Sequence, residues 1–171
     1  MSAPDAGGPV ASADGDSAPD AGDAQHVPDD PPGVTVRDGD ERATVEGRRL
    51  LAMDRERVER EYLCASGERW GGVWRGVPLA AVLAAAGVDL DGDATHLRVA
   101  AAGEYAVCVP VTTALDAHLA VERDGGPLPP DRGPRFLARV DAGKTVKAVR
   151  DLELLRLDPG EDPEDYEDLG Y

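Results

Sequence analysis

Aromatic side chains and long apolar runs are scarce in this chain of 171 residues. It has one phenylalanine, two tryptophans and four tyrosines, so valine, leucine and alanine must build most of any core. No apolar run approaches the roughly 20 residues that cross a bilayer. The N-terminus lacks both an apolar signal segment and a twin-arginine pair. These absences predict a cytoplasmic protein without a membrane span.

Cysteine is scarce as well, because the chain contains only Cys64 and Cys108. Two cysteines are too few for the disulfide framework of a small secreted domain. A reducing compartment fits such a chain, which again favours the cytoplasm.

Basic residues are missing from both ends of the chain. Residues 1–32 contain seven aspartates, residues 158–171 contain seven acidic residues, and neither stretch has an arginine or a lysine. Segments with so few branched or aromatic side chains do not offset their ordering entropy. We therefore expect two disordered acidic tails that flank one domain over residues 33–157.

The formal net charge of −16 arises mainly from these tails. The chain has 34 acidic and 18 basic residues. Without the 14 acidic residues of the tails, the domain has 20 acidic residues against the same 18 basic ones. Acidic tails repel phosphates and the domain has no basic stripe, so nucleic-acid binding is not expected. Acidic termini combined with arginine in place of lysine are halophile-like.

The domain is expected to contain many short strands and few helices. The clearest helix covers 78–86, because apolar residues recur there at helical spacing and Pro78 and Gly87 suit its two ends. Shorter helices are expected over the charged residues 54–60 and over 112–117. Strands are expected at 34–37, 42–46, 61–64, 74–77, 95–101, 105–109, 118–123, 135–140 and 146–157. Because these elements show no βαβ alternation, they predict an α+β fold.

Cys64 is the residue at which chemistry is expected to centre. It ends a predicted strand and precedes a loop that contains Ser66, Gly67 and Arg69. A nearby guanidinium and loop amides favour a thiolate, and small residues allow backbone N–H groups to approach a ligand. Cysteine is equally common as a small buried apolar residue, so both interpretations stay open for Cys64. Cys108 lies inside an apolar strand, where a structural role is favoured.

Residues 64–69 resemble the Cys-x-x-Gly-x-Arg loop of rhodanese-like sulfurtransferases. The resemblance implies a cysteine persulfide on Cys64, held by the loop amides. In that family the loop leads directly into a helix. Here the next predicted helix begins only at Pro78, so sulfur transfer ranks behind the hypotheses that follow.

A second resemblance covers nearly the whole domain and points to the sulfite-oxidase-type molybdopterin-binding domain. Its sequence blocks occur in the family's order: Tyr62-Leu63-Cys64, Trp74-Arg75-Gly76-Val77-Pro78-Leu79, Gly103-Glu104-Tyr105, Gly126-Pro127-Leu128-Pro129-Pro130-Asp131-Arg132-Gly133 and Gly143-Lys144-Thr145-Val146-Lys147. The resemblance implies a mixed β-sheet domain with few short helices. It also implies a molybdenum–molybdopterin cofactor and an oxidoreductase of the oxo-transfer type.

The resemblance further implies roles for individual residues. Cys64 takes the position of the metal's thiolate ligand, and a soft thiolate suits a sulfur-rich metal centre. Arg69 and Tyr105 are placed at the catalytic pocket. The residues implied for cofactor binding are Cys64, Ser66, Gly67, Arg132, Lys144 and Lys147.

The two lysines add an observation of their own. Sixteen of the 18 basic residues are arginines, and both lysines, Lys144 and Lys147, fall in the last sequence block. A compact ammonium is not interchangeable with a planar guanidinium, which favours contact with the cofactor or its phosphate. The alternative is a pair of ordinary surface lysines on a strand edge.

Departures from the family pattern define a second functional hypothesis. The family's N-terminal Asn-x-His-like element has no counterpart in the domain, and the histidine of its "PPDHG" stretch is Arg132. The paired arginines after the cysteine are reduced to Arg69. A cofactor-free binding or interaction domain that retains the fold is therefore the alternative to an enzyme. For the enzyme, we expect a small-molecule or anionic substrate and a redox partner protein, while the substrate itself is undetermined.

The aromatic residues near these blocks have different expected roles. Trp74 is expected to pack in the core, where aromatics supply much of the buried area. For Trp70 and Tyr105, packing and a place at the rim of the metal pocket both remain open.

Overall fold

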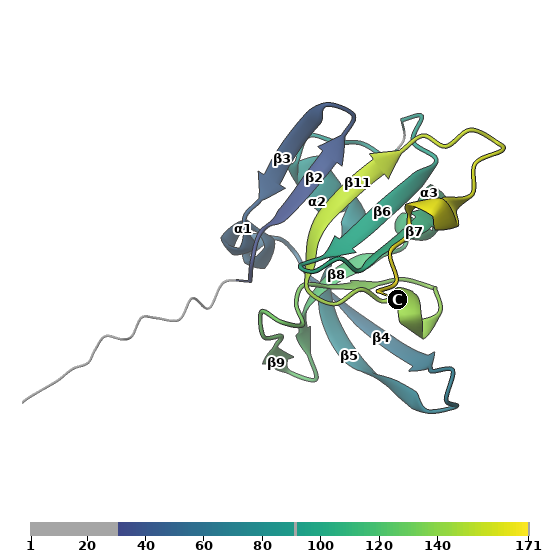
Figure 1. Cartoon of the computed structure of the whole chain (residues 1–171). Coiled ribbons are helices and arrows are strands. Elements are labelled where there is room, and N and C mark those ends of the chain that lie inside the picture. Colours follow the sequence, from purple (N-terminus) through teal and green to yellow (C-terminus); the bar gives the residue numbers. More distant parts are fainter. Residues whose placement is uncertain (1–30, 91, 171) are drawn as a thin grey trace, which may run out of the picture.

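The computed structural model describes residues 31–90 and 92–170, and within them the strands form two five-stranded sheets (Figure 1). The first sheet has the order β3-β2-β11-β6-β7, with bounds Glu41–Val45, Val34–Asp38, Val149–Leu155, His96–Ala101 and Ala106–Pro110. The second has the order β10-β8-β5-β4, with bounds Arg135–Leu137, His118–Arg123, Arg69–Pro78 and Glu56–Leu63, and β9 (Gly126–Pro127) pairs with β8. β11 runs parallel to β2 and antiparallel to β6. The expected α+β fold with mixed pairing is confirmed.

Helices are short and few among the described residues. They are α1 (Gly47–Ala52), α2 (Leu79–Ala85), α3 (Val111–Ala114) and two 3₁₀ turns, η1 (Ala142–Lys144) and η2 (Pro163–Tyr166). The predicted helix over 78–86 corresponds to α2, whose Leu79, Val82 and Leu83 are fully buried. The short helix expected over 112–117 corresponds to the single turn of α3. The sequence reasoning did not anticipate α1.

The helix predicted over 54–60 is wrong, because these residues enter strand β4. Val58 and Tyr62 are buried while most residues between them point outward, which is the alternation of a strand with one buried face. Cross-strand pairing stabilises this geometry, since Val58 lies opposite Trp74 and Tyr62 lies opposite Trp70 on β5. Charged residues favoured a helix locally, whereas pairing with a strand further along the chain decided the structure.

The core consists mainly of valine, leucine and alanine, as the scarcity of aromatics predicted. Trp74 and Phe136 are the largest fully buried side chains of the described residues. Trp74 joins Val58, Tyr62 and Leu137 in a separate cluster under the β4–β5 hairpin. The predicted packing role of Trp74 is therefore confirmed, and this cluster holds the hairpin that carries Cys64.

The acidic C-terminal segment is held by specific contacts, unlike the disordered tail expected over residues 158–171. The predicted N-terminal tail lies almost wholly outside the described residues. Figure 1 shows the C-terminal segment, in yellow, beside β7. Asp168 exchanges two backbone hydrogen bonds with Ala106, of 2.7 and 2.9 Å, and Leu169 packs against the core. The Nε of Arg98 donates to the carbonyl of Tyr166 at 2.8 Å. Specific hydrogen bonds thus order a segment that has little apolar area to bury.

Glu167 makes the most buried contact of this segment. Its side chain is 5% exposed and lies 3.1 Å from the Lys144 ammonium. The same carboxylate oxygen accepts a 2.8 Å hydrogen bond from the backbone N–H of Cys108. Glu167 therefore connects the C-terminal segment to both β7 and the turn η1.

Replacing Glu167 tests whether this carboxylate holds the segment in place. Glu167→Ala leaves the Cys108 N–H and the Lys144 ammonium without their partner, so we expect a loss of about 1–3 kcal/mol in the free energy of unfolding. Urea denaturation measures this change. Glu164→Ala, an exposed glutamate of the same segment, should leave stability within about 0.5 kcal/mol of the wild type. Equal effects of the two substitutions would contradict the assignment.

Candidate functional site

Cys64 lies directly after β4, in the tight turn that joins it to β5. The N–H of Cys64 donates to the carbonyl of Glu68 at 2.8 Å, and the N–H of Gly67 donates to the carbonyl of Cys64 at 2.8 Å. Gly67 has φ +87°, a conformation that L side chains rarely adopt. The turn leads into β5, not into a helix, so it lacks the helix N-terminus of a rhodanese loop. Cys64 is half-buried at the end of the hairpin.

A cavity of about 700 Å³ opens beside Cys64, and we call it the Cys64 cavity. Four separate segments of the chain contribute to it. Its walls come from the hairpin (Cys64, Ala65, Trp70), from the end of β6 and the connection to β7 (Ala101, Tyr105), from β10 (Arg135) and from residues 142–147 (Ala142, Gly143, Thr145, Lys147). Of the residues selected from the sequence, the fold brings Cys64, Tyr105 and Lys147 together here. Trp70, whose role was open, also lines the cavity.

Arg135 is the main cavity residue that the sequence reasoning did not select. Its guanidinium lies 4.4 Å from the ring centre of Trp70 and 5.8 Å from that of Trp74. One terminal nitrogen donates to the hydroxyl oxygen of Thr145 at 2.9 Å. Its Nε is buried without a hydrogen-bond partner. In the sequence, Arg135 stands out only as a charged residue between Pro134 and the core residue Phe136. The sequence does not show whether its side chain points into a cavity or into solvent.

The charge of Arg135 is unusually costly where it lies. Burial and, to a lesser extent, the neighbouring positive charges of Arg123 and Arg132 together lower its pKa to about 10, against an opposing effect of Tyr62. The guanidinium nevertheless remains charged at neutral pH. A cation held over two indole faces with an unpaired buried N–H is suited to receive an anionic group.

Tyr105 and Lys147 approach the cavity from its other side. The Tyr105 hydroxyl donates to the carbonyl of Gly143, which ties the β6–β7 connection to η1. Lys147 is exposed at the cavity. The next residue, Ala148, has φ +52° and is buried, a strained conformation for alanine that lies at the β-bulge opening β11.

The other residues selected from the sequence lie elsewhere. Arg69 is exposed and pairs with Glu61 at 2.8 Å. Ser66 and Gly67 are exposed in the turn, and Arg132 is also exposed. Lys144 pairs with Glu167 and lines a different cleft. None of these five residues is among those that line the Cys64 cavity in the described part of the chain.

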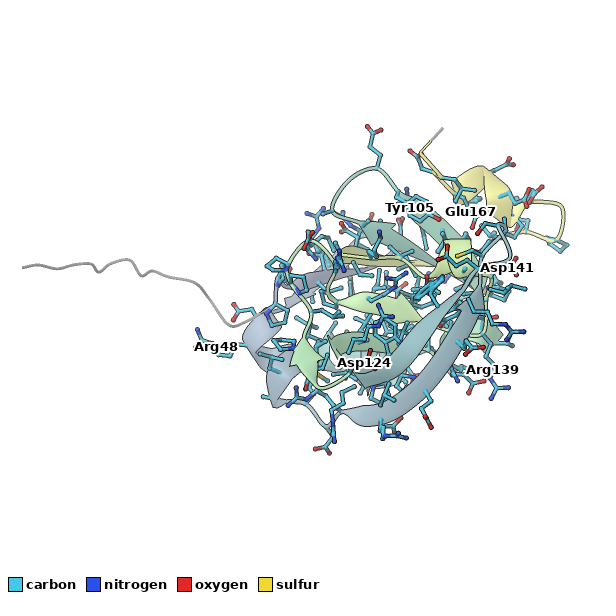
Figure 2. All side chains as sticks on the ribbon, turned by 90° about the horizontal axis from the view of Figure 1, so that it is seen from below. Arg48, Tyr105, Asp124, Arg139, Asp141 and Glu167 are labelled. Carbon is cyan, nitrogen blue, oxygen red and sulfur yellow. The ribbon has the colours of Figure 1, made fainter. Side chains whose placement is uncertain are left out.

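The two cysteines differ in their surroundings. Cys108 is 2% exposed on β7, in agreement with the predicted structural role. Burial and the nearby carboxylate of Glu167 raise the pKa of its thiol to about 11, against the opposing charges of Lys144 and Arg98. Figure 2 shows Glu167 and Tyr105 on the same side of the domain. Because Cys64 is half-buried and Cys108 is buried, Cys64 is the more accessible of the two thiols.

Comparison with known protein families assigns residues 36–160 to the oxidoreductase molybdopterin binding domain. The chain belongs to this family, which confirms the resemblance found in the sequence. Among solved structures, the fold is similar to that of the sulfane dehydrogenase SoxCD from Paracoccus pantotrophus. The TM-score is 0.65 at 20% identity, and the match covers 76% of this chain but only 39% of that one. A comparison with curated proteins finds no significant match.

Two kinds of feature are absent from residues 31–90 and 92–170. No helix there is long and apolar enough to cross a membrane. No group of three or more histidine, cysteine, aspartate or glutamate side chains in these residues could hold a metal ion.

Thiol labelling tests the contrast between the cysteines. At pH 8, we expect a thiol reagent to modify Cys64 in the native protein and to reach Cys108 only after unfolding, because a thiol with a pKa of about 11 is almost wholly protonated there. Mass spectrometry of the labelled peptides measures this. Cys64→Ser should abolish native-state labelling, whereas fast labelling of Cys108 in that variant would contradict the structure.

Proposed function

We propose that this protein is a molybdenum-cofactor-dependent oxidoreductase that binds its cofactor in the Cys64 cavity, with the Cys64 thiolate as metal ligand. One observation carries the proposal: the fold gathers a half-buried thiol, an incompletely paired arginine and an exposed lysine around one cavity. Membership of the family supports a molybdopterin as the ligand.

The residues present fit such a group. A thiolate is a ligand of the right softness for a metal whose other sulfur ligands come from a dithiolene. A volume of about 700 Å³ falls within the roughly 300–1,000 Å³ of typical ligand pockets. The unpaired Nε of Arg135 and the Lys147 ammonium match the negative charge of a pterin phosphate.

Each cavity residue then has a defined task. When bound, the cofactor supplies the oxo-transfer chemistry, while the protein positions and tunes it. Cys64 binds the metal from the end of the rigid β4–β5 hairpin. Arg135, held by Trp70 and Thr145, orients the phosphate with Lys147. Trp70 covers one side and limits the entry of water.

Tyr105 and the overall charge of the cavity bear on the substrate. The hydrogen bond from Tyr105 to the Gly143 carbonyl keeps its ring at the cavity rim, beside the segment that carries Lys147. Two cations at the cavity favour an anionic small molecule. Arg69, if it takes part, acts from the outer face of the hairpin, where it pairs with Glu61. A cytoplasmic location and a redox partner protein remain predictions from the sequence.

A cofactor-free interaction domain is the second candidate, and one observation favours it. Lys144, which the family resemblance gives to the cofactor, is neutralised by the chain's own Glu167 at 3.1 Å. A site that has lost one of its two lysines in this way holds a phosphate less strongly. Metal content decides between the two candidates.

The deciding experiment measures molybdenum and pterin in full-length protein purified from a host that makes the cofactor. The wild type should contain both. Cys64→Ser should lose nearly all molybdenum, and Arg135→Gln with Lys147→Gln should lower the pterin content by about tenfold or more. Cys108→Ala, the matched cysteine control, should retain the wild-type content provided that its melting curve shows a folded protein.

Three results would contradict the proposal. Wild-type protein without molybdenum or tungsten would favour the interaction domain. Equal metal content in the wild type and in Cys64→Ser would remove Cys64 as the ligand. Thiosulfate:cyanide sulfur transfer that depends on Cys64 would instead revive the rhodanese hypothesis.

A further inference from the structure

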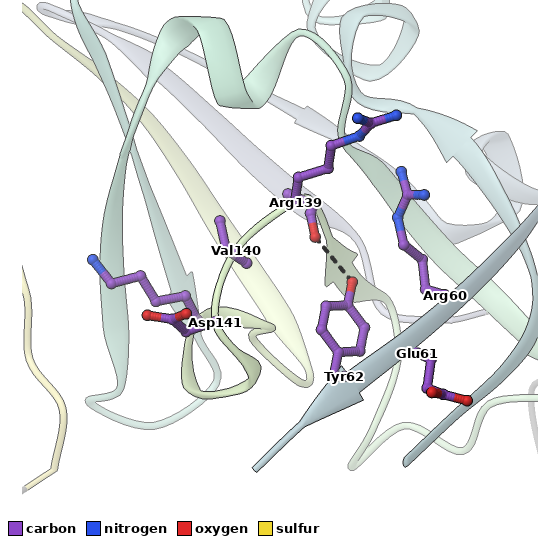
Figure 3. Close-up of a pocket in the computed structure, with 8 residues that line it drawn as sticks. Arg60, Glu61, Tyr62, Arg139, Val140 and Asp141 are labelled. Atoms are coloured by element: carbon purple, nitrogen blue, oxygen red, sulfur yellow. Dashed lines mark hydrogen bonds between the residues drawn. The ribbon is translucent and has the colours of Figure 1, made fainter. Parts of the chain in front are cut away.

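A second cleft lies on the other side of turn η1 from the Cys64 cavity. It measures about 530 Å³ and runs between strand β4 and residues 138–144. Arg60, Glu61 and Tyr62 form one wall, and Arg139, Asp141 and Lys144 contribute charged side chains to the other (Figure 3). We call it the Arg60–Arg139 cleft. The two sites share the turn, since Ala142 and Gly143 line the Cys64 cavity.

Three polar side chains of the cleft are already engaged. The carboxylate of Glu61 pairs with Arg69 at 2.8 Å, on the hairpin. The ammonium of Lys144 pairs with Glu167 at 3.1 Å. The Tyr62 hydroxyl donates to the carbonyl of Ala138 at 3.0 Å, as the dashed line in Figure 3 shows. These three groups are held by contacts within the protein, and the other charged residues of the cleft are Arg60, Arg139 and Asp141.

The remaining cations are Arg60 and Arg139. Among the ion pairs of residues 31–90 and 92–170, none includes either guanidinium. The Nε of Arg60 is buried and has no hydrogen-bond partner. In Figure 3 the side chains of Arg60 and Arg139 both extend toward the top of the view, above the ring of Tyr62. Burial raises the pKa of Tyr62, and the charge of Arg60 opposes that effect because Arg60 lies close to the Tyr62 hydroxyl.

Two such arginines define the chemistry of a ligand. A guanidinium presents five N–H donors in a planar fork that matches groups with two or more oxygens. A buried donor without a partner is unfavourable, so a ligand that pairs with the Arg60 Nε relieves that cost. Ala138 and Val140 give the cleft only a small apolar surface, so the cleft does not suit a large hydrophobic ligand.

We propose that the Arg60–Arg139 cleft binds a small oxoanion or carboxylate, held between the guanidiniums of Arg60 and Arg139. The proposal concerns a site other than the Cys64 cavity and does not rest on the presence of a cofactor. Such a site would concentrate an anionic substrate or product next to the turn that the two sites share.

Asp141 allows a second test of the proposal, in which the expected change in anion affinity is opposite to that of the arginine substitutions. Asp141 also lines the cleft, on the far side of Val140 from the two arginines in the view of Figure 3, and its carboxylate makes no capping hydrogen bond to η1. It therefore repels an anion that the arginines attract. Removal of its charge should strengthen binding, whereas removal of either arginine charge should weaken it.

The test titrates full-length protein with sulfate, phosphate and acetate in separate experiments at constant ionic strength, set with chloride. Binding is followed by backbone amide shifts in NMR spectra and by calorimetry. Arg139→Gln should weaken binding about tenfold, and Arg139→Lys, which keeps the charge but loses the planar fork, should weaken it less. Arg75→Gln removes an exposed arginine of β5 and should change the affinity less than about twofold. Asp141→Asn should tighten it.

The outcomes separate clearly. Shifts that concentrate at residues 60–62 and 138–141 and vanish in Arg139→Gln support the site, and the strongest of the three anions identifies the class of ligand. Equal weakening in Arg139→Gln and Arg75→Gln would mean general charge screening and would overturn it. Shifts confined to Thr145 and Lys147 would place the anion in the Cys64 cavity instead. Because Arg139 is exposed, its substitution leaves the core intact, and Arg60→Gln provides an independent second variant.

Discussion

The stacking of Arg135 over Trp70 and Trp74 is the interaction on which the geometry of the candidate site depends. It connects three parts of the chain: β10, the β4–β5 hairpin that carries Cys64, and Thr145 in the segment that carries Lys147. The indole faces stabilise a guanidinium that burial disfavours. Without Arg135, the hairpin and the segment that carries Lys147 would still line the same cavity, but no charged residue would contact both.

Charge pairing, not apolar burial, determines what each lysine does. Lys147 remains exposed at the Cys64 cavity, whereas Lys144 is held by Glu167 from the C-terminal segment. Glu167 is nearly inaccessible and also receives the Cys108 N–H, so its carboxylate is more than a surface partner. Composition alone describes this acidic segment as solvated, but its Glu167 contacts Lys144 of turn η1.

Turn η1 also separates two environments of different character. On one side, Gly143 accepts the Tyr105 hydroxyl beside the thiol of Cys64. On the other, Asp141 lines an open cleft together with Arg60 and Arg139. Neighbouring residues of one short segment thus line both sites, Asp141 and Lys144 the cleft and Ala142 and Gly143 the cavity.

Local sequence patterns predicted secondary structure correctly where the tertiary contacts favour the same structure. Helix α2 has apolar residues at helical spacing between a proline and a glycine, and it forms as expected. The strands expected at 34–37 and 42–46 form the hairpin of β2 and β3, which turns at Gly39 and Asp40 because Asp38 pairs with Glu41. The end of strand β4 was expected from the sequence as a strand over 61–64, but its first half was mistaken for a helix because charged residues outnumber the two buried ones. Only pairing with β5 reveals the full period of the strand.

By itself, the sequence determined the fold family, the Val-Leu-Ala core and the choice of Cys64 as the central thiol. Ordered motifs and residue types carry that information directly. The tertiary structure alone decided which cations face that thiol: it added Arg135, kept Lys147, and directed Lys144, Arg69 and Arg132 elsewhere. The physical reason is that the direction of a long charged side chain depends on partners far away in sequence, such as Glu167 for Lys144 and the two tryptophans for Arg135.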